Sequence, residues 1–319
     1  MNVYWFQDSK TGHLKQVQAL LDQLKKETEL SLTTIKHSDQ VSFSEMFSRR
    51  DQFNGQTILI GAGHDVYSTI LQAKKYLQKF ISKNIYSIAV LRPSYKLNSF
   101  DLIVAPEHDF RNRRLPKNVI PFKGSLAVTS QIPVDESKAI IAIGGPSKHY
   151  KFDQKILMKQ LNYILSVYPK HEFKIFNSRR TPDALNIKLK DNLSNYPNVK
   201  FIHLNSPESD TFQDSLNRSS LKFVTPDSSN LVFEALSVKG QTYLIQIESP
   251  TYRRIFGTKK IRESMNELVN TKRVGVVSIL NKKGGVDIST IESPALHFEP
   301  LAEVEKVSFS IMKFINHQI

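Results

Sequence analysis

The sequence predicts an α/β protein with two consecutive doubly wound domains and a cleft between them. Two observations support this prediction. Short apolar runs alternate with amphipathic helical patterns along the chain, which is typical of a parallel sheet covered on both faces. The chain is also long enough, at 319 residues, for two ordinary domains, because single hydrophobic cores stop growing at about 250–300 residues.

The first half begins with an apolar run over residues 2–6, which is typical of a strand. A helix is predicted over residues 13–27, with Leu14, Val17, Leu20, Leu21 and Leu24 on one face. Further strands are expected at 30–36, 56–62, 86–92, 101–106 and 118–122, and a second helix at 66–82. Residues 1–123 are predicted to form the N-terminal domain.

Residues 123–138 contain Gly, Ser, Thr, Pro and scattered charges without a sustained period, which indicates a linker. Strands are then expected at 139–145, 173–178, 199–204, 221–226 and 242–247, and helices at 152–168 and 228–239. These elements predict a second domain over residues 139–301. A last amphipathic helix, 302–316, is expected to pack back on the N-terminal domain.

Composition narrows the class of protein. The chain is 40% hydrophobic and 23% charged, as in soluble globular proteins, and no run reaches the roughly 18 uncharged apolar residues that span a bilayer. Cysteine is absent, which excludes disulfides, thiolate metal sites and a cysteine nucleophile. The N-terminal residues lack the features of a signal peptide, so a cytoplasmic location is expected.

The chain carries 44 Lys and Arg against 30 Asp and Glu, a formal net charge of +14. This excess favours an anionic partner, such as a nucleotide, a phosphorylated substrate or an acidic membrane surface. Lysine-rich surfaces that are simply exposed to solvent explain the excess of positive charge equally well. The sequence shows no nucleic-acid-binding signature, and its histidines lack the spacing of a metal-ligating pair. Neither nucleic acid nor a metal ion is therefore expected to bind.

Two strand-to-helix loops in the first half contain Gly-His, at Gly12-His13 and at Gly63-His64. Ligands of doubly wound sheets bind at such loops. An imidazole titrates near neutral pH and suits a general base, and Asp8 precedes the first pair. The alternative is an exposed loop histidine beside a turn glycine.

The second half has a glycine loop at 143–150, in which Gly144 and Gly145 permit close backbone approach to a ligand and Ser147 can cap or bind. The next loop holds Arg179 and Arg180, whose guanidinium groups make forked contacts with phosphate.

Thr181 is predicted to be the N-cap of the following helix, with Pro182 at its first position. In the stretch 224–240, Asp227 or Ser228 is predicted to cap a helix whose N-terminus, with Ser229, would hold a pyrophosphate. Glu234 on that helix would accept hydrogen bonds from sugar hydroxyls, unless the helix is simply a capped surface helix.

These motifs together resemble the mitochondrial-fission ELM1-like family, which is similar to the GT-B superfamily of glycosyltransferases. The matching pieces are DSKTGHLKQVQAL, IGAGH, IAIGGPSKHY, NSRRTPDAL and VTPDSSNLVFEALSVKG, spread over nearly the whole chain. The resemblance implies two Rossmann-like domains, an N-terminal one for the acceptor and a C-terminal one for a nucleotide-sugar donor. It also implies no cofactor and no obligatory metal.

The resemblance can be carried over residue by residue. It implies donor contacts at Gly144, Gly145, Arg179, Arg180, Asp227, Ser228, Ser229 and Glu234, to which Ser147 is added as a further candidate. Gly12, His13 and His64 fall on the acceptor side, and Gly63 lies beside them. The loop at 203–216 departs from the family pattern and keeps only Asn205 and Pro207.

The function that follows is transfer of a sugar from a nucleotide-activated donor to a cell-envelope acceptor, either lipopolysaccharide core or a lipid-linked glycan. His13 or Asp8 would remove the acceptor proton, at the inner face of the cytoplasmic membrane. Two alternatives stay open. One is a non-catalytic scaffold that binds a membrane or a partner, and the other is a sugar-nucleotide epimerase.

Overall fold

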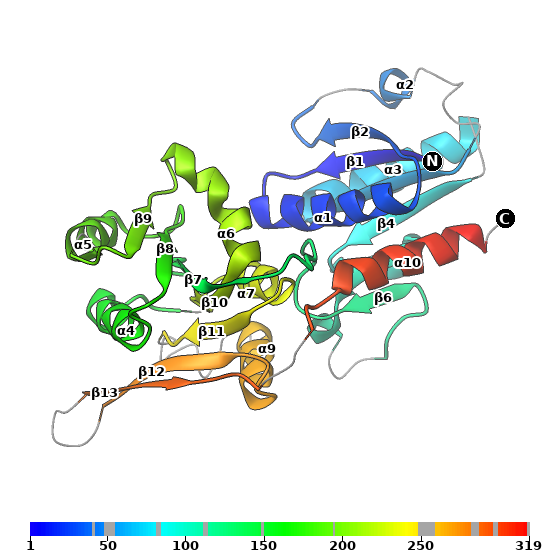
Figure 1. The fold of residues 1–319 in the computed structure, drawn as a ribbon. Coiled ribbons are helices and arrows are strands. Elements are labelled where there is room, and N and C mark those ends of the chain that lie inside the picture. Colours follow the sequence, from blue (N-terminus) through cyan, green and yellow to red (C-terminus); the bar gives the residue numbers. More distant parts are fainter. Residues whose placement is uncertain are drawn as a thin grey trace. The chain divides into compact units, whose positions relative to one another are not determined.

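The structure is a computed structural model that describes residues 1–39, 42–47, 55–80, 84–110, 114–147, 150–193, 195–247, 259–281, 287–295 and 299–317. The chain divides into two compact units (Figure 1). Unit 1 comprises Met1–Val128 and Ala302–Ile319, and unit 2 comprises Thr129–Leu301. Each unit is built around its own sheet.

The sheet of unit 1 has, over the described residues, six parallel strands in the order β2-β1-β3-β4-β5-β6. These are β1 (Asn2–Gln7), β2 (Ser31–Lys36), β3 (Thr57–Ala62), β4 (Ile85–Val90), β5 (Leu102–Pro106) and β6 (Val119–Phe122). The strand order reverses between β1 and β3. Ligands of doubly wound sheets bind at such a switch point, and the loops after β1 and β3 meet there.

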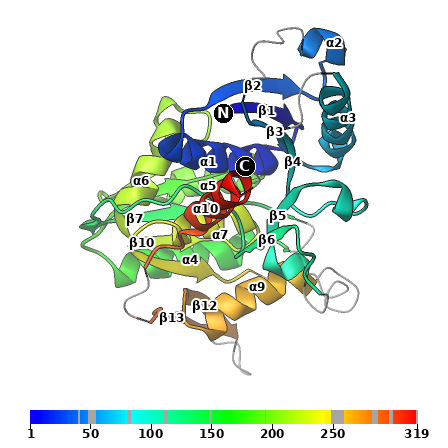
Figure 2. The ribbon, with the colours of Figure 1, turned by 90° about the vertical axis from the view of Figure 1, so that its right-hand side faces the viewer.

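Successive side chains of β1 lie on opposite faces of the sheet and pack in two different hydrophobic clusters. Val3 and Trp5 join a cluster with the helices α1 (Thr11–Glu27) and α10 (Glu303–Asn316). Tyr4 and Phe6 join the opposite cluster, with α2 (Phe43–Met46) and α3 (His64–Phe80). Helix α10 lies alongside α1 and also contacts β6 (Figure 2).

The sheet of unit 2 has seven strands within the described ranges, in the order β13-β12-β11-β10-β7-β8-β9. The strands are β7 (Asp135–Ala142), β8 (Glu172–Phe176), β9 (Val199–Ile202), β10 (Ser219–Val224), β11 (Gln241–Ile245), β12 (Gly275–Asn281) and β13 (Asp287–Glu292). All neighbours pair in parallel except β12 and β13. The switch point of this sheet lies between β7 and β10.

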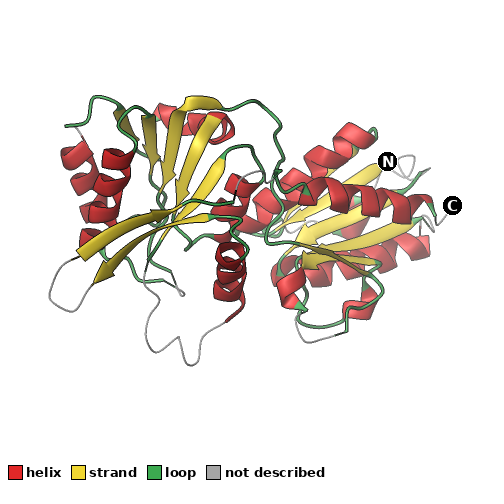
Figure 3. Ribbon diagram, turned by 60° about the horizontal axis from the view of Figure 1, so that its bottom comes forward, coloured by secondary structure: helices red, strands yellow, loops and turns green. Residues whose placement is uncertain are grey.

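Helices cover both faces of this sheet (Figure 3). One core cluster contains leucines of α4 (Gln154–Val167) and α5 (Asp183–Leu193). The other contains residues of α6 (Phe212–Arg218), α7 (Ser229–Leu236) and α9 (Lys259–Asn270). The parallel strands that approach the switch point are therefore buried on both sides.

The structure corrects three details of the sequence prediction. Strand β7 begins at Asp135, so the last residues of the expected linker 123–138 already belong to the sheet of unit 2. Strands β12 and β13 were not anticipated. Helix α3 begins at His64, so this histidine is helical and does not belong to the preceding loop.

None of the described helices is both long enough and apolar enough to cross a membrane.

Candidate functional site

The switch point of unit 1 contains a carboxylate–imidazole pair. Asp8 follows β1, and its Oδ2 lies 2.6 Å from Nδ1 of His13 in the first turn of α1. The Asp8 side chain is fully buried, whereas that of His13 is 23% exposed. The backbone N–H of Lys10 donates to Asp8 Oδ1 at 3.1 Å. A carboxylate on Nδ1 fixes the orientation and tautomer of the ring, which leaves Nε2 as the nitrogen for proton exchange with a ligand.

Gly63 allows this pair to form. Its φ of +104° lies in the left-handed region, which a residue with a side chain adopts only with strain. An added Cβ would also lie 2.8 Å from His13 Nδ1, and closer still to Asp8 Oδ2. The loop after β3 therefore has to carry glycine at this position.

The other two residues predicted for this side do not join the pair. His64 is exposed at the start of α3, where its ring and that of Tyr67 form a T-shaped pair with a centroid distance of 5.7 Å. Gly12 was predicted to lie in a strand-to-helix loop, but it lies in the first turn of α1, which begins at Thr11. Its conformational freedom is therefore not used there.

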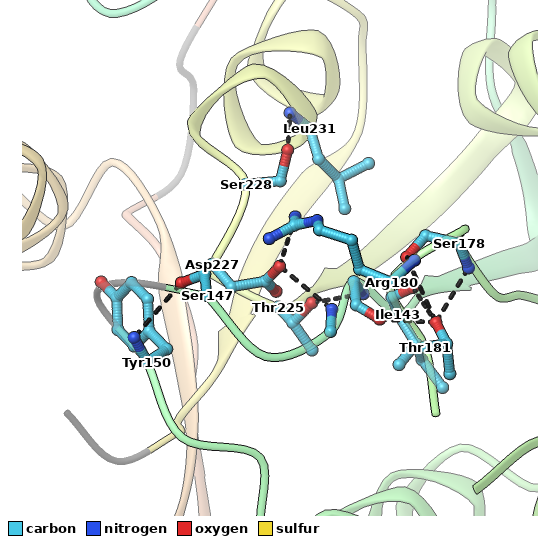
Figure 4. A network of polar contacts seen from close by, with 12 residues as sticks. Ile143, Ser147, Tyr150, Ser178, Arg180, Thr181, Thr225, Asp227, Ser228 and Leu231 are labelled. Carbon is cyan, nitrogen blue, oxygen red and sulfur yellow. Dashed lines mark hydrogen bonds and ion pairs between the residues drawn. The ribbon is translucent and has the colours of Figure 1, made fainter. Parts of the chain in front are cut away.

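At the switch point of unit 2, three strand-end loops converge on Asp227 (Figure 4). The Asp227 side chain is fully buried. Its Oδ2 accepts a hydrogen bond from the Gly145 N–H at 3.1 Å and one from Arg180 Nη2 at 2.6 Å. Gly145 follows β7, Arg180 follows β8 and Asp227 follows β10. These three loops were predicted from the sequence, but the ion pair between Arg180 and Asp227 was not.

Two buried threonines hold the peptide groups on both sides of Gly144. The Gly144 N–H donates to Thr225 Oγ1 at 2.8 Å. The Thr181 hydroxyl donates to Gly144 O at 2.5 Å and approaches Ile143 O at 3.2 Å. Thr181 was predicted to cap the following helix, but α5 begins at Asp183 and this hydroxyl holds the glycine loop instead.

A sequence signal for these threonines does exist. Thr-Pro-Asp occurs twice, at 181–183 and 225–227, in each case after a strand of the same sheet. In the sequence prediction the copy at 181–183 serves as the start of a helix and is not compared with the copy at 225–227.

Steric contacts explain the two glycines after β7. An added Cβ on Gly144 would collide with the Asp227 carboxylate, and one on Gly145 would collide with the Arg180 carbonyl. Both glycines are buried. They allow three loops to approach each other closely.

The electrostatics of Asp227 reflect competing effects. Burial raises the pKa of the Asp227 carboxyl, while hydrogen bonds from Thr225 and from the Gly145 N–H and the charge of Arg180 oppose that rise. The Arg180 side chain is 43% exposed, so part of its guanidinium faces solvent. Since a guanidinium has five N–H donors and the bond to Asp227 occupies one, Arg180 can also hold an anion.

Helix α7 completes this site. Ser228 is its N-cap, and its Oγ accepts from the Leu231 N–H at 3.4 Å. Ser229 begins the helix, and Glu234 lies half-buried further along it. Of the two predicted caps the structure selects Ser228, while Asp227 turns toward the glycine loop.

Two predicted donor residues lie at the edge of this network. Arg179 is exposed in the same turn as Arg180. Ser147 forms a local turn, in which its Oγ accepts from the Tyr150 N–H at 3.2 Å. As for metals, the described part of the chain contains no group of three or more His, Asp and Glu residues placed to hold an ion.

Two Rossmann-like units, each with polar loops at the switch point of its sheet, define an α/β protein with two doubly wound domains. The chain belongs to the mitochondrial fission ELM1 family, whose sequence profile matches residues 11–314. The predicted fold class and family are confirmed, whereas the predicted cleft between the domains stays a prediction.

Several individual proteins are similar to this chain. An uncharacterized protein of Rickettsia prowazekii (strain Madrid E), RP120, is 24% identical over an alignment of 369 positions, which covers 98% of this chain and 98% of that one. The structure of UDP-GlcNAc 2-epimerase from Neisseria meningitidis bound to UDP-GlcNAc is similar with a TM-score of 0.50 and 14% identity, over 99% of this chain and 100% of that one. ADP-heptose lipopolysaccharide heptosyltransferase II of E. coli gives a TM-score of 0.47 and 9% identity, over 100% of this chain and 99% of that one. At these identities the structural similarity concerns the fold alone.

Proposed function

We propose that this protein is a GT-B-type glycosyltransferase that moves a sugar from a nucleotide-activated donor to a cell-envelope acceptor, either lipopolysaccharide core or a lipid-linked glycan. The observation that carries the proposal is the convergence of the glycine loop, Arg180 and the α7 N-terminus at the switch point of unit 2. A helix N-terminus beside a guanidinium suits a diphosphate, because both present N–H donors and positive charge.

Each group has a role in the proposed reaction. A bond forms between the acceptor oxygen and the anomeric carbon, and the bond from that carbon to the phosphate oxygen breaks. The acceptor proton passes to His13, which Asp8 orients through Nδ1. Arg180, together with Arg179 and the α7 N-terminus, stabilises the charge that develops on the leaving phosphate. Glu234 accepts hydrogen bonds from sugar hydroxyls.

Arginine side chains and backbone N–H groups stabilise the negative charge on the leaving phosphate in this scheme. The proposed reaction therefore requires no metal and no cofactor. The net charge of +14 suits an anionic acceptor at the inner face of the cytoplasmic membrane.

Donor binding is the first test. Thermal unfolding would be recorded with UDP, GDP, ADP, dTDP and CMP and with their sugar conjugates. A ligand at 100 times its Kd adds about 2.7 kcal/mol to the free energy of unfolding. The variant Arg180→Ala should lose most of this stabilisation. Arg218→Ala is the matched control, because Arg218 pairs with Asp214 through an exposed ion pair elsewhere in unit 2. Normal donor binding by an Arg179→Ala/Arg180→Ala protein would refute the phosphate role.

A sugar-nucleotide epimerase is the second candidate, because the Asp8–His13 pair could also exchange protons with a sugar nucleotide. Product analysis separates the two enzymes. A transferase releases the nucleotide when the acceptor is present, whereas conversion of the sugar nucleotide into its epimer without any acceptor would support the epimerase. Absence of binding to every nucleotide would favour the scaffold.

A further inference from the structure

The carboxyl ends of β1, β3 and β4 form one row of residues in unit 1. These three strands are neighbours in the sheet and run parallel. Their register, continued one or two residues beyond the paired positions, places Asp8 beside Gly63 and Gly63 beside Leu91. Neighbouring strands lie about 4.8 Å apart, so the row spans about 10 Å from β1 to β4. The Asp8–His13 pair therefore lies at one end of the row and Leu91 at the other.

Leu91 turns the chain at the β4 end of this row. Its φ of +69° lies in the left-handed region, which a leucine adopts only with strain. Tyr67 of α3 is 2% exposed, and its hydroxyl donates to Val90 O at 2.7 Å and approaches Leu91 O at 3.0 Å. A strained backbone that its surroundings hold in place is a common feature of functional sites. The turn fixes the direction in which the next residue, Arg92, leaves the sheet.

Arg92 is half-buried and lies against an aromatic ring. Its guanidinium carbon is 5.3 Å from the centroid of the Phe110 ring, which follows β5. Phe110 is 6% exposed, so this ring is a firm support. A cation–π contact attracts the charge to the face of the ring and occupies none of the hydrogen-bond donors of the guanidinium. Pro93 also favours extended backbone at Arg92. The ring and the proline therefore hold the side chain in place while its donors stay available.

The N–H groups of Arg92 have no partner within the described ranges. Nε is buried and forms no hydrogen bond there, and the two Nη groups, which keep accessible surface, form neither a hydrogen bond nor an ion pair with a described residue. By contrast, Arg180 and Arg218 both pair with carboxylates. A half-buried guanidinium is normally paired, because burial of an unpaired charge is unfavourable. The Nη end of Arg92 is therefore suited to an anion from outside the chain.

The two ends of the row match an acceptor that carries an acidic group. We propose that the Nη groups of Arg92 bind an oxyanion of the acceptor, a phosphate or a carboxylate, while the hydroxyl that receives the sugar lies at Nε2 of His13. Two parallel N–H donors of a guanidinium fit either oxyanion. The separation of about 10 Å between β1 and β4 places the acidic group and the reacting hydroxyl on different parts of the acceptor. The inference rests on the proposed function for one point, which is that unit 1 binds the acceptor.

The test uses the full chain with Arg179→Ala/Arg180→Ala, so that the phosphate site proposed for unit 2 does not contribute. Glucose 6-phosphate, glucuronate and glucose are the probes, because they carry a phosphate, a carboxylate and a hydroxyl at the same position. NMR titration of the histidine Cε1–H signals measures each dissociation constant. We expect the preferred charged hexose to bind at least tenfold more tightly than glucose, which corresponds to ~1.4 kcal/mol. The hexose that binds most tightly identifies the oxyanion as phosphate or carboxylate.

Three variants, made in the same background, locate the preference. Arg92→Gln removes the charge and should reduce the preference to less than about twofold. Arg92→Lys keeps the charge without the planar fork and should keep only part of the preference. Lys26→Gln is the control, because it removes one positive charge from an exposed position in the last turn of α1 and should keep the full preference.

The histidine signals also show where the hexose binds. A charged hexose should shift the signals of His13 and His64, which lie at the strand ends of unit 1, and leave those of His171 and His203 in unit 2 unchanged. If Arg92→Gln does not fold, this comparison decides, since it needs no substitution at Arg92.

The outcomes separate this inference from the proposed function. Absence of any preference for a charged hexose, or a full preference in Arg92→Gln, would overturn the inference. Signal shifts confined to His171 and His203 would overturn it as well. None of these results affects the donor site, which nucleotide binding by the wild type tests separately. Failure of the wild type to bind any nucleotide would instead refute the proposed function.

Discussion

Lys222 should make the stability of unit 2 rise with pH. It lies in β10 with a fully buried side chain, and its ammonium donates hydrogen bonds to the carbonyl oxygens of Val238 and Lys239 after α7. Burial lowers its pKa from 10.5 to about 7. In an unfolded chain the same lysine would titrate near its ordinary value.

The sign of the effect follows from proton uptake. Below pH 7 both states are protonated, and Lys222 contributes no pH dependence. Between about pH 7 and 10.5 the unfolded chain holds a proton that the folded chain has lost, so the free energy of unfolding rises with pH. A difference of about 3.5 in pKa, at 1.36 kcal/mol per unit, corresponds to about 5 kcal/mol over that window.

Urea unfolding at pH 6, 7, 8 and 9, followed by circular dichroism, measures the effect for the wild type and for Lys222→Met. The wild type should gain about 1 kcal/mol per pH unit relative to the variant above pH 7. Lys200→Met is the control, because the Lys200 side chain in the same sheet is 60% exposed. Parallel pH profiles for wild type and Lys222→Met would show that Lys222 does not cause the rise in stability with pH.

Three further outcomes are expected. Gly63→Ala should lower the stability of unit 1 by at least 1–2 kcal/mol, the approximate strain of a left-handed residue, whereas Gly55→Ala, where an added Cβ meets nothing within 4 Å, should unfold at the wild-type temperature. Thr225→Val leaves the buried Gly144 N–H without its acceptor and should cost about 1–3 kcal/mol in the same unfolding measurement. Asp8→Asn should lower the turnover of the proposed transferase by about 10²–10⁴ and leave donor affinity unchanged, because it disturbs the ring of His13 in unit 1; a parallel loss of donor affinity would contradict this assignment.

The sequence predicted strands β1 to β11 because each contains a short apolar run, but it missed the parallel strand β12. Strand β13 was missed for a physical reason. Among the described strands it pairs with β12 alone, at the edge of the sheet, and polar residues such as Asp287, Ser289 and Glu292 interrupt its apolar pattern. No sustained apolar run marks such a strand.

The loops of the candidate site were predictable, because ligands of doubly wound sheets bind at the carboxyl ends of strands. The hydrogen-bond and ion-pair partners of the side chains in these loops were not predictable. Arg180 and Asp227 are 47 residues apart in the chain, and their contact arises because β8 and β10 both lie next to β7. Local patterns carry no information about which strand-end loops will be neighbours.

The place of α10 in the chain affects how unit 1 is made. Val304, Val307 and Ile311 of this helix are buried against Leu20 and the core around it, yet they follow all of unit 2 in the chain. At about 5–20 residues per second, a ribosome needs on the order of ten seconds to synthesise the residues between the two parts of unit 1. During that interval nascent unit 1 exposes the apolar strip that α10 will cover, so a chaperone has a defined surface to bind until α10 is synthesised.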